Sequence, residues 1–165
     1  MCGKGRQQSP IHIRTHRAKV DLTLTELNVS YNVLSSGYMI NEAHALSVEV
    51  GDAGHLFLDG QDYTLLHFHF HSPSEHIIDG VHPPLEMHMV HESADGKTLA
   101  VIGIPFMVGS PSPFLDEFWI KYRLLEAASG VQADPSRTQQ QAYTKAARKS
   151  GAITDGRQAI ALDGT

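Results

Sequence analysis

The feature that most constrains the fold of this chain is the alternating stretch HFHFH, which begins at position 67. In a β-strand, side chains two positions apart share a face. His67, His69 and His71 therefore line one face of a predicted strand. Phe68 and Phe70 line the other face, which we expect to pack into the core. The alternation thus predicts a strand that is apolar on one side and carries three imidazoles on the other.

Histidine is over-represented in the chain, with 11 residues among 165. Cysteine is represented by Cys2 alone, which excludes an intrachain disulfide and a zinc site built on cysteine. Two interpretations of the alternating histidines are open: a partly buried structural patch that holds no metal, and a metal site. Any metal site in this chain must be built from imidazole and carboxylate groups.

The spacing of the three histidines limits how they can share a metal ion. Neighbouring same-face Cα atoms of a strand are about 6.6 Å apart, because the strand rises about 3.3 Å per residue. Two adjacent imidazoles can lean onto one zinc ion at Zn–N distances of about 2.0–2.1 Å, whereas the outer pair, about 13 Å apart, cannot easily do so. The third ligand is therefore expected from a neighbouring strand. Spacing alone leaves open which two of the three histidines bind.

The segment LEMHMVH at positions 85–91 offers that third ligand. Glu86 and His88 share one face of the predicted strand, while His91 points the opposite way and is expected to be structural. Two histidines from one strand and His88 from its partner give three neutral nitrogen ligands with an open fourth position. This is the arrangement of a catalytic zinc site, because structural zinc sites have all four positions closed by protein ligands.

Short apolar–polar alternations joined by Gly, Pro and Asp turns predict a mainly β (α+β) protein with a central, largely antiparallel sheet. With 41% hydrophobic and 19% charged residues, a chain of this length is expected to form one domain with a real core. The predicted strands span residues 22–33, 45–50, 55–58, 63–71, 85–92 and 99–108.

The sequence changes character after the last predicted strand. Residues 113–128 carry aromatic and aliphatic side chains at near-helical spacing, which predicts one amphipathic helix. Residues 130–165 are rich in Gln, Ala, Ser, Lys and Arg and short of large apolar side chains, so they can bury little surface. We therefore expect a domain over residues 1–129 and a tail of low order or weak helix over residues 130–165.

Charge and hydropathy exclude some classes of partner. A net charge of -5 and the lack of a Lys/Arg cluster argue against a nucleic-acid partner. No apolar run approaches the roughly 18 residues needed to span a bilayer, which argues against a membrane partner. The chain begins with the polar and basic MCGKGRQQ, which lacks the pattern of a secretory signal peptide.

Four segments together are similar to the alpha-class carbonic anhydrases, most closely the bacterial ones. The resemblance runs from about Cys2 to Trp119 and implies the family's fold, a central and largely antiparallel twisted sheet. The combination of the histidine segments is highly specific, although each piece alone is a weak signal. The four segments are QQSPIHI, NEAHALSVEV, LLHFHFHSPSEH and LEMHMVHESADGKTLAVIGIPFMVG.

The resemblance implies roles for individual residues. His69, His71 and His88 match the family's three ligands of Zn²⁺, the implied cofactor. A metal-bound histidine nearly always has an outer partner that orients its ring. The remaining matches are Glu86, which orients the His88 imidazole; Glu75, a buried glutamate that anchors the hydroxyl network; His44, the proton shuttle; Val90 and Val101, the apolar walls of the carbon dioxide pocket; and His67, where the family generally has a glutamine that supports a zinc ligand.

The implied activity is the zinc-dependent, reversible hydration of carbon dioxide to bicarbonate and a proton, which is the reaction of a hydro-lyase. Three neutral imidazoles leave the charge of zinc undiluted, which lowers the pKa of a bound water, an effect for which carbonic anhydrase is the standard example. His44 is then expected to pass the released proton to solvent. The alternative is a catalytically silent relative that serves as a zinc-binding, binding or storage module.

The resemblance fades after Trp119. The family's Ser-Leu-Thr-Thr-Pro-Pro-Cys block, whose threonine hydrogen-bonds the glutamate that Glu75 matches, has no counterpart, and the Trp-rich N-terminal lead-in is missing as well. We therefore expect a chain truncated at both ends, in which zinc binding survives and turnover is impaired. The resemblance implies a periplasmic or secreted protein, but without a signal peptide a complete chain of this sequence is expected in the cytoplasm.

Overall fold

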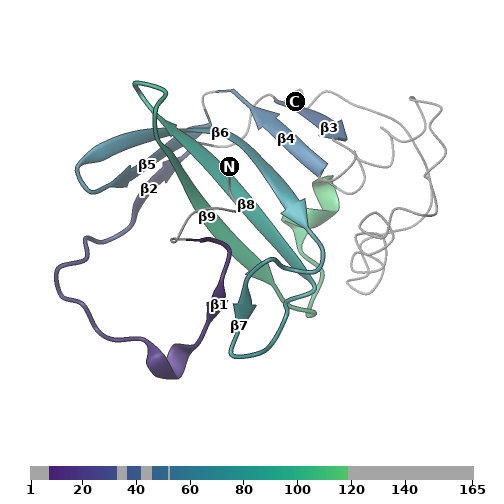
Figure 1. The fold of residues 1–165 in the computed structure, drawn as a ribbon. Coiled ribbons are helices and arrows are strands. Elements are labelled where there is room, and N and C mark those ends of the chain that lie inside the picture. Colours follow the sequence, from purple (N-terminus) through teal and green to yellow (C-terminus); the bar gives the residue numbers. More distant parts are fainter. Residues whose placement is uncertain (1–7, 33–36, 42–45, 52, 119–165) are drawn as a thin grey trace.

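A computed structural model describes residues 8–32, 37–41, 46–51 and 53–118 of the chain. Strands dominate this part and form one curled, antiparallel, seven-stranded sheet, shown in Figure 1. The prediction of a mainly β, largely antiparallel fold is therefore confirmed. The strands of the sheet are β2 (Asn28–Tyr31), β3 (Gly37–Asn41), β4 (Leu46–Val50), β5 (Gly54–Leu58), β6 (Gln61–His71), β8 (Leu85–Ser93) and β9 (Leu99–Phe106).

Strand β6 is the centre of this sheet. Along one edge it pairs first with β5 and then with β4, and the order continues outward to β2 and β3. Along its other edge β6 pairs with β8, which in turn pairs with β9. The long strand that carries the alternating histidines is therefore flanked on both sides, and its two faces are set by its neighbours as well as by its own alternation.

A second, two-stranded parallel sheet joins β1 (His12–Ile13) to β7 (Ile77–Ile78), below the main sheet in Figure 1. Backbone hydrogen bonds tie the same two segments together, from Ile77 to Ile11 and from Asp79 to Ile13. Asp79 also accepts two hydrogen bonds from Thr15, which begins the 3-10 helix η2 (Thr15–Arg17). These contacts hold the N-terminal segment beside the loop that follows β6.

A register shift interrupts the pairing of β6 with β8. Leu65 lies opposite His91 and His67 lies opposite Val90, so one extra residue of β6 has no counterpart on β8. Such a β-bulge moves the side-chain alternation by one position. Leu65 and Phe68 are consequently buried on the same face of β6, although their spacing in an unbroken strand would place them on opposite faces.

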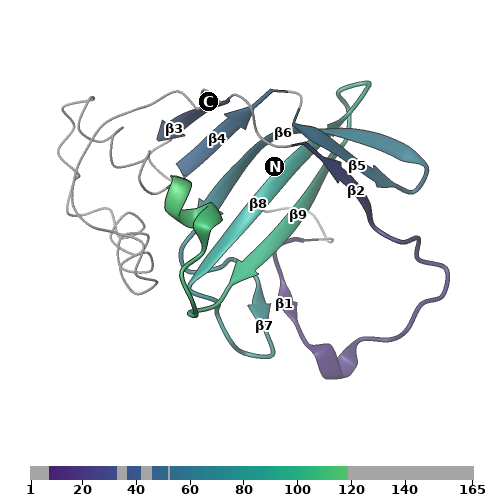
Figure 2. The same ribbon diagram turned by 180° about the vertical axis from the view of Figure 1, so that it is seen from behind.

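The core lies on the face of the sheet opposite the histidines. Phe68 and Phe70 are both buried there, as the alternation predicts. Residues 113–118 are helical and lie against β4 and β6 in Figure 2, with Phe118 packed edge-on against Phe68 at 5.1 Å between ring centroids. The predicted helix is thus observed up to residue 118, and residues 119–165, including the predicted tail, lie outside the described range.

Among the described residues, none of the helices has the length and apolar character of a membrane span.

One predicted strand is much shorter than expected. Of residues 22–33, only Asn28–Tyr31 form a strand, β2. Asp21 accepts hydrogen bonds from the backbone N–H of Thr23 at 2.9 Å and from its hydroxyl at 2.7 Å, which forms a local turn. Residues 20–27 pair with no other strand in the described chain, and their apolar side chains are exposed. The predicted strand therefore forms only over the residues that pair with a neighbouring strand.

His91 is completely buried on the core side of β8, as expected for a structural residue. One ring nitrogen, Nε2, lies 2.8 Å from the hydroxyl of Tyr31, and the other, Nδ1, lies 3.2 Å from the carbonyl oxygen of Ala100. Because Nδ1–H must donate to the carbonyl, the neutral ring accepts a hydrogen bond from Tyr31 at Nε2. Burial lowers the pKa of His91, and this outweighs the hydrogen bonds, which act in the opposite direction.

This burial predicts a loss of stability in mild acid. Between the lowered pKa of His91 in the folded state and its ordinary value near 6.5, only the unfolded chain binds the proton. The free energy of unfolding should therefore fall as the pH drops below about 6.5, by at most about 1.4 kcal/mol per pH unit from this one group. Urea unfolding of metal-free protein at a series of pH values should show a shallower dependence for His91→Gln than for the wild type. The exposed His16→Gln is the control, and equal slopes for His91→Gln and the wild type would contradict the prediction.

Candidate metal centre

The pairing of β6 with β8 brings three histidines together on one face of the sheet. His69 lies directly opposite His88, and His71 lies opposite Glu86, one same-face position further along. Each of the three histidines offers a ring nitrogen, and these three atoms all lie within 4.8 Å of one another. The ring centroids are 4.9 Å apart for His69 and His71, 5.3 Å for His69 and His88, and 4.8 Å for His71 and His88. Two strands thus present three imidazoles to one point.

The structure shows which histidines of β6 can share one metal ion, a choice that their spacing in the sequence left open. His67 shares the face of His69, at 5.4 Å between ring centroids, but it lies opposite Val90, which offers no ligand atom. Within the described residues, His67 belongs to no group of possible metal ligands. Its place beside His69 is compatible with the supporting role that the resemblance implies.

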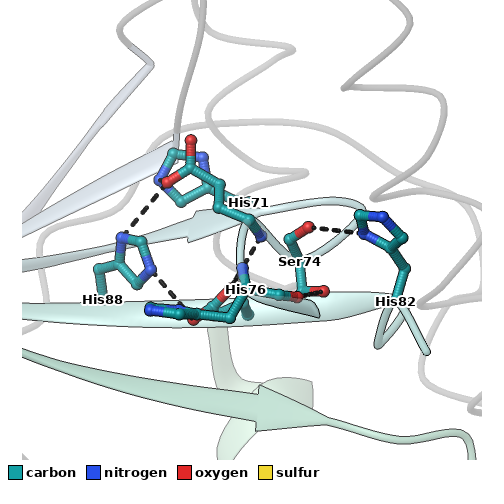
Figure 3. Close-up of polar contacts among 7 residues, drawn as sticks. His71, Ser74, His76, His82 and His88 are labelled. Atoms are coloured by element: carbon teal, nitrogen blue, oxygen red, sulfur yellow. Dashed lines mark hydrogen bonds and ion pairs between the residues drawn. The ribbon is translucent and has the colours of Figure 1, made fainter. Parts of the chain in front are cut away.

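The two ring nitrogens of His88 face different carboxylates, and Figure 3 shows both contacts. Nδ1 lies 3.8 Å from Oε2 of Glu75, on the side of His71. Nε2 lies 3.2 Å from Oε1 of Glu86, and although it is buried it makes no aligned hydrogen bond. The contact with Glu86 occupies Nε2, so Nδ1 is the nitrogen that points toward the other two histidines.

Glu86 is buried behind the histidines and is held by several contacts. Its Oε2 accepts the backbone N–H groups of Glu75 at 2.8 Å and His76 at 2.9 Å, and its Oε1 pairs with Nδ1 of His76. Burial alone would raise the pKa of Glu86, but hydrogen bonds and charge from His76 outweigh it, so that the pKa lies below its usual value. A fixed, ionised carboxylate beside Nε2 of His88 is the outer partner that a metal-bound histidine requires.

His76 and Gly103 complete this arrangement, although neither was among the predicted site residues. His76, in the segment SPSEH, anchors Glu86 through both its backbone and its ring. Gly103 lies opposite His88 on β9, and a Cβ atom there would come within 2.8 Å of Oε1 of Glu86. A larger residue at position 103 would therefore displace the carboxylate. No local pattern signals either role, since both depend on contacts between segments.

A cavity of about 610 Å³ opens beside His88, the one member of the three-histidine cluster that lines it. The N-terminal segment forms one wall, and β8, β9 and the loop after β6 form the others. Polar groups gather at one side, where Glu75, Glu86 and His88 reach the cavity, and apolar groups form much of the remainder. The lining residues are Ser9, Pro10, Ile13, Glu75, His76, Ile78, Glu86, His88, Val101, Gly103 and Pro105.

The remaining predicted site residues differ in whether they line this cavity. Val90 is buried on the face that carries His88 but does not line the cavity. Val101 lines the cavity, and 53% of it is exposed. It lies on β9, which pairs only with β8 in the described part of the chain and so stands at the edge of the sheet. The predicted proton shuttle, His44, lies outside the described residues.

Glu75 also departs from its expected setting. The resemblance implies a buried glutamate, whereas the Glu75 side chain is 44% exposed. Its carboxylate instead extends toward the histidines, with Oε2 lying 3.4 Å from Nε2 of His71.

Comparison with known proteins identifies the family. A model of the eukaryotic-type carbonic anhydrases matches residues 1–110. The chain belongs to the alpha carbonic anhydrase family. This membership agrees with the resemblance inferred from the histidine segments, and alpha carbonic anhydrases generally use zinc.

Individual relatives include both enzymes and differently named proteins. Dioscorin DB3S from Dioscorea polystachya is 43% identical over 117 residues, which cover 70% of this chain and 43% of the relative. A carbonic anhydrase from Pectobacterium carotovorum is 38% identical over 125 residues, covering 72% of this chain and 47% of the relative. A hyperthermostable carbonic anhydrase from a hydrothermal vent chimney superposes with a TM-score of 0.62 at 35% identity, covering 70% of this chain and 50% of the other. The chain thus spans less than half the length of the curated relatives described here.

The residues that are present fit a zinc ion. Three imidazoles provide neutral nitrogen donors, the kind of ligand set that zinc accepts in catalytic sites. His88 directs Nδ1 toward the other two histidines, and the fixed carboxylate of Glu86 stands 3.2 Å behind its Nε2. The arrangement therefore supplies both the ligands and the outer support of a metal centre.

Proposed function

We propose that this carbonic anhydrase-family chain holds Zn²⁺ through His69, His71 and His88 and catalyses the reversible hydration of carbon dioxide to bicarbonate. The observation that supports the proposal most directly is the meeting of three ring nitrogens within 4.8 Å on adjacent strands. Family membership supports the same reaction in general. Bound zinc would supply Lewis-acid activation of water at this point.

The chain's own residues have separate tasks in this proposal. Glu86, held in its ionised form by His76, orients the His88 ring and keeps Nδ1 directed at the other histidines. Ile13 and Val101 give the cavity apolar surface suited to carbon dioxide, which has no charge to pair. His44 remains the predicted carrier of the proton to solvent. Together these groups would position substrate, ligands and proton exit around one centre.

The proposal is tested by metal content and activity measured on the same preparation. We expect one zinc per chain, and carbon dioxide hydration that is inhibited by a sulfonamide and lost in His88→Ala. The exposed His16→Ala serves as the control and should retain both properties. A chain without zinc, whose melting temperature is unchanged by a chelator, would instead support a structural histidine patch.

A second candidate function is a catalytically silent zinc-binding, binding or storage module. The similarity to dioscorin, at 43% identity, supports this candidate. Stoichiometric zinc without measurable hydration of carbon dioxide would favour it over the enzyme.

A further inference from the structure

The N-terminal segment, residues 8–17, forms one wall of the cavity, although packing holds it only weakly. Ser9, Pro10 and Ile13 line the cavity from this segment. Ile13 lies opposite Ile78 of β7, which lines the cavity as well. Every residue of the segment is exposed, so little of the apolar surface that usually fixes a segment in place is buried here. The position of this wall must therefore depend on directed hydrogen bonds.

The turn that follows β7 supplies these hydrogen bonds. The N–H of Asp79 donates to the carbonyl oxygen of Ile13 at 2.9 Å. The next N–H, that of Gly80, donates to Nε2 of His12 at 3.0 Å. The Asp79 carboxylate accepts two hydrogen bonds from Thr15, one from its N–H at 2.8 Å and one from its hydroxyl at 2.5 Å. Two successive residues of the turn thus hold the segment at three of its residues.

The backbone conformation of Asp79 allows its main chain and its side chain to act together. Its φ of 48° lies in the left-handed region, which Asp adopts more readily than most residues, and Gly80 follows with a φ of 84°. Hydrogen bonds from Thr15, chiefly the one from its hydroxyl, lower the pKa of the Asp79 carboxyl group and so favour the ionised acceptor. Figure 1 shows the result, with β1 held beside β7 below the main sheet.

We propose that Asp79 is a positioning residue, which sets the apolar wall of the cavity by clamping residues 12–15 to β7. The inference rests on the function proposed above, in which Ile13 gives the cavity apolar surface suited to carbon dioxide. Asp79 lies outside the cavity lining and acts through Ile13 and Ile78. Without the clamp the wall moves away and the substrate loses apolar contact. The three clustered histidines keep their places, because β6 and β8 carry them.

The test compares wild type with Asp79→Gly, which removes the carboxylate and still adopts a positive φ. We expect KM for carbon dioxide to rise by about fourfold or more, the effect of losing the burial of roughly one methylene group, while kcat and zinc content stay at the wild-type level. Trypsin cleavage after Arg14 should be faster, because cleavage requires the segment to leave β7. Asp79→Asn keeps one acceptor oxygen and should lie between the two in both measurements.

A partner variant and a matched control show whether the effect belongs to this clamp. Thr15→Val removes the donating hydroxyl and should raise KM less than Asp79→Gly. The double variant should be no worse than Asp79→Gly alone, since both changes remove the same hydrogen bond. The control is Asp59→Gly, because Asp59 also has a positive φ, of 51°, precedes a glycine and accepts a hydrogen bond from a threonine, Thr25, at 3.0 Å. It lies outside the cavity lining and should retain the wild-type KM.

The outcomes separate this inference from the function on which it rests. Circular dichroism checks that each variant is folded. A wild-type KM in Asp79→Gly overturns the positioning role, and so does an equal rise in KM in Asp59→Gly. Loss of kcat or zinc with an unchanged KM also overturns it, because Asp79 would then act through the metal ligands. A wild type that binds zinc but hydrates no carbon dioxide overturns the proposed function, and equal cleavage after Arg14 in wild type and Asp79→Gly then overturns the clamp as well.

Discussion

Replacing His88 with alanine should abolish specific zinc binding. His88 is buried, and its ring centroid lies 5.3 Å from that of His69 and 4.8 Å from that of His71. The change removes a ligand and also removes the ring that Glu86 supports. The loss of affinity should therefore be much larger than the about 10–100-fold caused by losing an outer-shell partner alone. Competition for zinc against a chromophoric chelator measures this affinity directly.

Two further variants make this result specific. Glu86→Gln retains all three histidines but weakens the support of His88, so its affinity should fall within the about 10–100-fold range. His16→Ala removes an exposed imidazole far from the cluster in sequence and should leave the affinity unchanged. Wild-type affinity in His88→Ala would show that the ion is bound elsewhere or that no site exists at these strands.

Replacing Phe70 with alanine should destabilise the fold by about 3–5 kcal/mol. Phe70 is completely buried and lies 5.9 Å from Phe68 and 6.4 Å from Phe118 between ring centroids. Truncation leaves a cavity that surrounding side chains fill only in part, which adds to the lost burial of apolar surface. Urea unfolding in the presence of a chelator measures the free energy of unfolding without the contribution of bound metal.

The matched control for this loss is Phe57→Ala. Phe57 lies on β5 with 42% of its surface exposed and stacks on His55 at 6.1 Å. We expect it to cost less than half as much, because its ring is already partly in water. Equal losses for both variants would mean that Phe70 does not occupy the core that the structure describes.

The same strand explains why stability and metal binding should be coupled. Phe70 stands between His69 and His71 in β6, and the two kinds of side chain face opposite sides of the sheet. A change in the packing of Phe70 therefore moves the backbone that carries two ligands. We expect Phe70→Ala to weaken zinc binding as well, even though its ring is not in the site.

The sequence predicted correctly, for most strand residues, which face of the sheet each side chain occupies, because this depends only on local alternation. The separation of histidines from phenylalanines in residues 67–71, and of His88 from His91 in β8, agrees with the structure. Alternation failed at residues 22–27, where a turn at Asp21 and the lack of a described partner strand prevent a strand. It also could not anticipate the exposure of Val101, which depends on the neighbours of β9.

The choice of ligands shows the same division between local and nonlocal information. The alternation of side chains places three histidines of β6 on one face, but it does not show which of them can be ligands. That choice depends on the register of β6 and β8, because His69 lies opposite His88 whereas His67 lies opposite Val90. The bulge before His67 contributes to this register, and nothing in the local alternation predicts its consequence for the pairing.

By itself, the sequence determined which side chains share a face, that imidazoles and carboxylates are the available ligands, and which family the chain resembles. Only the tertiary structure showed that the ring nitrogens of His69, His71 and His88 meet. It also showed that His76 holds Glu86, and that the Glu75 carboxylate lies beside His71 and His88. The physical reason is that side-chain direction follows from the backbone geometry of one strand, whereas a ligand set requires atoms from several segments to meet.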